Sequence, residues 1–155
     1  MDYLWLKTVH VVAAIVFVGN IVVTALWKSM ADRTRDPKIV AFGQRLVTVT
    51  DIAFTGLGAF VVLATGMFMI GNFGDEPFGL AWLAWGLGLF LVSALLWAAV
   101  LVPVQIKQAR LARRFAQGGG IPDEYWRLGR VWMMVGFLAT ILPLVNVYFM
   151  VHKPA

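Results

Sequence analysis

The stretch that decides the fold is residues 4–27, LWLKTVHVVAAIVFVGNIVVTALW, in which nearly every residue is apolar. A helix rises 1.5 Å per residue, so about 20 such residues cross a hydrocarbon core of about 30 Å. The stretch also carries a few polar residues that fall within an arc of roughly 140° on a helical wheel, namely Lys7, His10, Asn20 and Thr24. Because an unpartnered polar group is costly in lipid, this face is predicted to turn toward other helices of a bundle.

The whole chain has the composition of a membrane protein. Of its 155 residues, 61% are hydrophobic, and the mean hydropathy is +0.81, whereas a soluble domain is about half apolar or less. Four apolar segments predict an all-α, integral membrane four-helix bundle in one domain, with helices at about 4–27, 46–70, 80–116 and 125–151. The first segment is expected to be retained, because its apolar run exceeds the roughly 7–15 residues of a signal-peptide core.

Charge predicts the orientation of this bundle. The connections at 28–45 and 105–130 carry most of the lysines and arginines, whereas the connection at 71–79 contains Asp75 and Glu76 and no basic residue. Basic loops stay in the cytoplasm. Both termini are therefore predicted to be extracytoplasmic, in a bacterial inner membrane with the lipid bilayer as partner. The net charge of +5 is read as this orientation signal and not as nucleic-acid binding.

The second apolar segment has an interior face of its own. Asp51 is the one acid near membrane depth, and two interpretations of it stay open. It is a structural residue, either in an ion pair with Arg45, Arg127 or Arg130 at the cytoplasmic interface or as an acid at a helix N-terminus, or it is a proton or ion site. Small and polar residues share its face at helical spacing, and these are Thr48, Thr55, Gly58, Thr65 and Gly66.

The candidate chemistry lies at the extracytoplasmic end, where imidazole and thioether side chains collect. Imidazole and thioether are ligands of haem iron and of copper. For haem b we predict His10 as axial ligand, with Lys7, Asn20, Trp97 and Asn146 around it. For copper the predicted ligand set is His10, Met69, Met150 and His152. The alternative is a histidine that only joins helices, with the methionines as filler.

The first helix also resembles known sequences. LWLKTVHVVAAIVFVGN, with Lys7 and His10, resembles a bacterial group that includes HemJ-type protoporphyrinogen oxidases and CopD copper-resistance membrane proteins. In HemJ-type proteins the matching histidine is thought to hold haem, so the resemblance implies a haem at His10. Those proteins have a lysine after a Trp-Leu pair in the third helix, where this chain has Gly86, and that departure argues against the oxidase activity but not against haem.

A second resemblance covers nearly the whole chain. DEYWRLGRVW at 123–132 and the closing VYFMVHKPA resemble a family of predicted integral membrane proteins of unknown function. Together these features predict a haem-b-associated redox or haem-pathway membrane protein, an oxidoreductase if it is an enzyme, with a homo-oligomer or a redox partner. The alternatives are a copper-handling or small-solute transport protein without enzymatic activity, and a ligand-free assembly subunit. No catalytic residue is predicted, because no phosphate loop, nucleophile triad or carboxylate pair occurs.

Overall fold

A computed structural model describes residues 2–73 and 77–154. Within these residues every regular element is a helix, as the all-α prediction requires. Asp75 and Glu76, on which part of the predicted orientation depends, lie outside the described residues. In chain order the elements are α1 (Tyr3–Thr34), α2 (Pro37–Thr50), the π-helix η1 (Asp51–Gly56), α3 (Leu57–Ile70), the short η2 (Gly71–Phe73) and η3 (Pro77–Gly79), α4 (Ala81–Leu96), the π-helix η4 (Trp97–Leu101), α5 (Val102–Phe115) and α6 (Asp123–His152).

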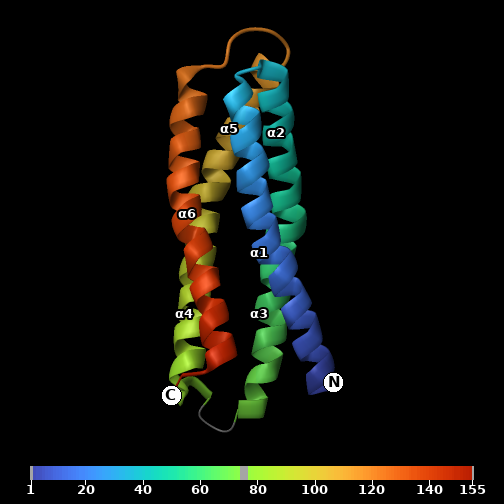
Figure 1. Ribbon diagram of the computed structural model, residues 1–155, viewed down its shortest axis with the longest axis vertical. Helices are drawn as coiled ribbons and strands as arrows, with labels where there is room; N and C mark the ends of the chain where they lie inside the picture. The colour runs from blue at the N-terminus through green and yellow to red at the C-terminus, as the bar shows by residue number, and fades with distance from the viewer. Residues whose placement is uncertain (1, 74–76, 155) are drawn as a thin grey trace.

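The elements combine into four rods, each long and apolar enough to cross a membrane. α1 and α6 are single helices, whereas Pro37–Ile70 and Ala81–Phe115 each consist of two α-helices joined by a π-helical segment. Figure 1 shows the rods side by side, with the N- and C-termini at the same end of the bundle. The four-span helical fold is therefore confirmed. We call this end the terminal end, and the opposite end, which carries most of the lysines and arginines, the basic end.

The first turn of the bundle is much tighter than predicted. α1 continues to Thr34 and α2 begins at Pro37, so most of the expected loop at 28–45 is helical. Arg35 adopts the left-handed conformation, with a φ of 57°, and ends α1. Asp36 then caps α2 by accepting hydrogen bonds from the backbone N–H groups of Lys38 and Ile39, at 2.8 and 3.1 Å. A capping aspartate followed by proline at the first helical position is a strong helix start.

The interior faces lie where the periodicity placed them. On the second rod Asp51, Thr55 and Thr65 are buried. On α1, Asn20 donates hydrogen bonds to the Thr55 hydroxyl and to the Thr50 carbonyl, at 2.9 and 3.2 Å. The opposite face of α1 is exposed and apolar, as a lipid-facing surface should be, and includes Val11, Val12, Ile15, Val22 and Val23.

The rods pack as two pairs over the terminal half of the bundle. α1 packs mainly on α3, and α4 mainly on α6, while contacts between the two pairs are sparse there. At the basic end α2 joins α1 to α5, and the bundle closes. Figure 1 shows the α1–α3 pair and the α4–α6 pair as separate ribbons toward the chain ends. We call the interface between the two pairs the seam.

Candidate functional site

The first cavity in the seam lies near the terminal end. This terminal-end pocket has a volume of about 200 Å³ and draws its walls from both helix pairs. Of the residues predicted to bind haem, Lys7, His10 and Asn146 line this pocket. Of the predicted copper ligands, Met69 and Met150 line it together with His10. The side chains that line the pocket include Lys7, His10, Met69, Trp82, Asn146 and Met150.

The hydrogen bonds of His10 decide which ring nitrogen is free. Its Nδ1 lies 2.9 Å from the Thr65 hydroxyl oxygen. That hydroxyl lies 2.6 Å from the Val61 carbonyl, to which it donates, so we assign Nδ1–H as the donor to the Thr65 oxygen. A neutral imidazole protonated at Nδ1 carries a lone pair on Nε2. With Nδ1 assigned to the bond with Thr65, Nε2 is the ring nitrogen of His10 that is left to bind a ligand.

The opposite wall of the terminal-end pocket depends on a glycine. A Cβ atom on Gly86 would lie 2.8 Å from the Asn146 Oδ1 and would collide with the Met150 methyl group. The absence of a side chain at Gly86 therefore lets α4 and α6 approach and lets both side chains reach the pocket. The Asn146 Oδ1 is buried and has no hydrogen-bond partner in the part of the chain that the structure describes. An unused acceptor of this kind is unusual in a packed interior.

The structure does not bring the other predicted ligands to this pocket. His152 is exposed, and its ring stacks on Tyr148 at a centroid distance of 4.3 Å. Trp97 lines a different cavity, and Asn20 bonds to the second rod. Among the described residues no group of three or more histidine, cysteine, aspartate or glutamate side chains could hold a metal ion.

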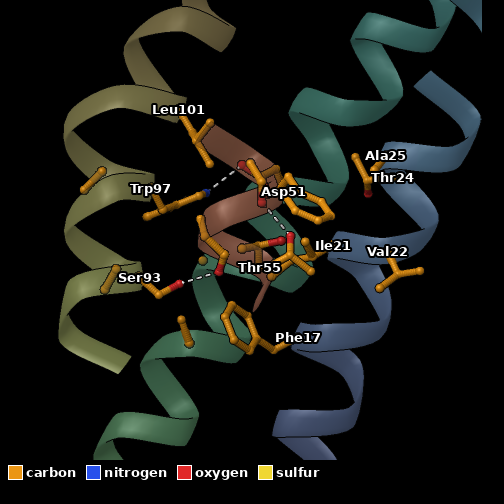
Figure 2. Close-up of a pocket in the computed structure, with 18 of the residues that line it drawn as sticks. Phe17, Ile21, Val22, Thr24, Ala25, Asp51, Thr55, Ser93, Trp97 and Leu101 are labelled. Atoms are coloured by element: carbon orange, nitrogen blue, oxygen red, sulfur yellow. Dashed lines mark hydrogen bonds between the residues drawn. The ribbon is translucent and has the colours of Figure 1, made fainter. Parts of the chain in front are cut away.

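The second cavity in the seam, the central cavity, has a volume of about 490 Å³. Figure 2 shows Asp51, Thr55, Ser93 and Trp97 around it. The Trp97 Nε1–H donates to the Asp51 Oδ2 at 2.8 Å. The predicted ion pair of Asp51 with Arg45, Arg127 or Arg130 is therefore wrong, because the partner is a neutral indole on η4. The sequence offered no way to pair these two residues, which are 46 positions apart.

The hydrogen bond between Asp51 and Trp97 joins two irregular turns. Asp51 is the first residue of η1, and Trp97 is the first residue of η4. π-Helical turns are rare and are frequently found at functional sites. Helical periodicity did not reveal either of them, because one extra residue per turn leaves the composition of an apolar segment unchanged.

The fold and its two cavities define a four-span α-helical membrane protein with a hollow interior interface. The chain belongs to the family described as "Predicted integral membrane protein (DUF2269)", whose model matches residues 4–154. This confirms the resemblance to predicted integral membrane proteins of unknown function, while the resemblance of the first helix to HemJ-type and CopD proteins stays a prediction. No curated protein matches the chain. No solved structure matches it either.

Proposed function

We propose that this integral membrane protein handles copper and binds copper(I) in the terminal-end pocket, with His10, Met69 and Met150 as ligands. The observation that carries the proposal is the hydrogen bond from His10 to Thr65. With Nδ1–H as the donor in this bond, the Nε2 lone pair is available to a cavity that the thioether side chains of Met69 and Met150 also line. Metal-bound histidines are commonly held in this way by a bond from the other ring nitrogen.

The chemistry of the donors favours copper(I) over other metals. Thioether sulfur is a soft ligand and selects copper(I), whereas magnesium, calcium and manganese prefer carboxylate and carbonyl oxygens. The pocket contains no carboxylate among its lining residues. Lys7 is exposed at the pocket and can extend its ammonium group toward the lipid headgroups, away from a bound cation.

Copper content tests the proposal. The purified protein is loaded with copper(I) under anaerobic conditions, freed of excess metal, and titrated with a copper(I) chelator. His10→Ala and Met69→Leu should each weaken binding by at least about tenfold, as should Thr65→Val, which removes the group that orients the imidazole. The matched controls are His152→Ala, because that histidine lies outside the pocket, and Met134→Leu, because Met134 is 73% exposed. Equal loss of copper in a control and in His10→Ala would refute the site.

Haem b at the same histidine is the second candidate, and one observation favours it. Lys7 and Lys153 line the pocket, and their positive charges suit the carboxylates of a haem. The pocket alone does not have room for the macrocycle, because about 200 Å³ lies below the roughly 300–1,000 Å³ of sites for drug-sized ligands. Haem would therefore have to extend past Phe90, which lines both cavities and whose ring lies at a centroid distance of 6.4 Å from that of Phe17.

Absorbance distinguishes the two candidates. Titration with haemin should give no shifted Soret band of a protein-bound haem if the pocket keeps its present size and takes only a copper ion. A Soret band that is lost in His10→Ala and kept in His152→Ala would replace copper by haem. A protein that takes up neither copper nor haem would instead support the role of a ligand-free assembly subunit, for which co-purification with a larger complex is the direct test.

A further inference from the structure

The carboxylate of Asp51 is buried at the wall of the central cavity without a cation. Its side chain is 8% exposed. Its hydrogen-bond donors are neutral groups, the Trp97 indole at 2.8 Å and, within hydrogen-bonding reach, the Thr55 hydroxyl and the Gln105 amide. In the part of the chain that the structure describes, the one ion pair is Lys28–Asp32. A buried carboxylate with neutral donors alone has an incomplete electrostatic environment, which a cation would complete.

The rest of the central cavity suits an apolar body. Its volume of about 490 Å³ falls within the roughly 300–1,000 Å³ typical of small-molecule sites. Aromatic rings from α1, α4, η4 and α6 line it and offer faces on which a positive charge is stabilised, and these rings are Phe17, Phe90, Trp97 and Trp132.

The cavity also reaches the lipid-facing surface of the bundle. Val22 on α1, Phe60 on α3 and Phe137 on α6 line it, yet 52%, 67% and 68% of these residues are exposed. The walls of the cavity are thus continuous with the surface that contacts acyl chains. A solute that dissolves in the bilayer can therefore enter from the side, without passing through the terminal-end pocket.

We propose that the central cavity binds a lipophilic organic monocation, with its positive centre at Asp51 and its apolar body between the two helix pairs. One carboxylate matches one positive charge, and the aromatic walls match a hydrophobic substituent. Trp97 is a positioning residue, because its N–H donates to one oxygen of the Asp51 carboxylate and so holds that side chain in place, as Figure 2 shows. The two π-helical turns place Asp51 and Trp97 opposite each other across the seam. The site is distinct from the proposed copper site, because His10, Met69 and Met150 line the terminal-end pocket and not the central cavity.

A pair of ions of equal shape and opposite charge tests the proposal. The full-length protein in phosphatidylcholine nanodiscs is dialysed against tetraphenylphosphonium or tetraphenylborate, with empty nanodiscs as the blank for partition into lipid. Protein-dependent binding is expected for the phosphonium cation and not for the borate anion. Equal binding of the two ions, or no protein-dependent binding of the cation, would overturn the proposal.

Two variants assign the binding to the cavity. Asp51→Asn keeps the acceptor for the Trp97 N–H but removes the charge, and should weaken phosphonium binding by roughly 30-fold or more. Asp123→Asn, an exposed aspartate at the start of α6, is the matched control and should bind like the wild type. Gly136→Leu fills the cavity and leaves the carboxylate in place, because a Cβ there has no neighbour closer than 4.0 Å. It should also abolish binding, so unchanged binding in either Asp51→Asn or Gly136→Leu refutes the site.

Discussion

Two aspartates in this protein meet an aromatic side chain from another rod, and their surroundings differ in one respect. At the basic end, Asp32 accepts a hydrogen bond from the Tyr125 hydroxyl at 3.1 Å and pairs with Lys28 at 3.1 Å. In the seam, Asp51 accepts from the Trp97 indole but has no ion-pair partner among residues 2–73 and 77–154. The difference indicates where a ligand can bind. The charge of Asp32 is balanced by Lys28, whereas the charge of Asp51 beside the central cavity is not balanced by another side chain that the structure describes.

In the basic-end cluster, made of Lys28, Asp32, Gln44 and Tyr125, the lysine uses its donors fully, whereas the buried Gln44 Nε2 has no hydrogen-bond partner among the described residues. Lys28 is 1% exposed, and its ammonium group donates to Asp32 at 3.1 Å, to Gln44 at 2.9 Å and to the Tyr125 hydroxyl at 2.9 Å. An ammonium group has three hydrogens to donate, and all three find acceptors. This cluster ties α1, α2 and α6 together and leaves no donor of Lys28 for a ligand. It is a structural lock, in contrast to the hollow seam.

The largest expected effect comes from opening this lock. Asp32→Ala leaves the Lys28 ammonium buried without its countercharge, so we expect a loss of about 3–5 kcal/mol in the free energy of unfolding. Equilibrium unfolding in mixed micelles measures it. The matched control Asp123→Ala, on an exposed aspartate, should change the stability by less than about 0.5 kcal/mol.

Asp51→Asn sharpens the comparison in the same experiment. It removes a carboxylate that has no cation, so no buried charge is left behind, and its cost should be smaller than that of Asp32→Ala. If Asp51→Asn lowered the free energy of unfolding as much as Asp32→Ala does, Asp51 would stabilise the fold in the same way as Asp32. The distinction between the two regions would then be wrong.

The sequence predicted the features that depend on one helix at a time. Hydropathy placed the four spans, and helical spacing placed Asp51, Thr55 and Thr65 on a buried face. It could not predict which faces meet, since periodicity reports the polarity around one axis and not the rotation of its neighbour. For this reason the sequence places Lys28 in the basic loop at 28–45, whereas in the structure it is a buried residue of α1. Its partner Tyr125 lies 97 positions further along the chain, so the sequence does not reveal the pair.

The candidate site was predicted only in part for the same reason. His10, Met69 and Met150 were grouped by depth, and they do line one pocket. His152 has the side chain of a copper ligand, but its ring stacks on Tyr148 outside the pocket. Trp97 was expected beside the haem, but at η4 it bonds to Asp51 in the wall of the central cavity. Side-chain direction at a helix end or at a π-helical turn depends on local contacts that a helical wheel does not contain.

An intermediate effect on stability is expected at Gly86, in the wall of the terminal-end pocket. In Gly86→Ala the new methyl group meets the Asn146 Oδ1 and the Met150 methyl group, so we expect a cost of about 1–3 kcal/mol. Copper binding should weaken as well, because Met150 has to move. The control is Gly88→Ala on the same helix, where nothing lies within 4 Å of an added Cβ. Higher helix propensity should make that variant equally stable or up to about 1 kcal/mol more stable.

The smallest expected effect tests how firmly α4 holds α6 beside the central cavity. The Ser93 hydroxyl donates to the Ala139 carbonyl at 2.8 Å, an interhelical bond that Figure 2 shows as a dashed line. Ser93→Ala should cost about 0.6 kcal/mol, the average for interhelical hydrogen bonds in membranes. Thr140→Val is the control, because the Thr140 hydroxyl bonds within α6 to the Gly136 carbonyl at 2.7 Å. If Ser93→Ala instead cost as much as Asp32→Ala, the seam would be held as firmly as the basic end, and its cavities could not open to a solute from the bilayer.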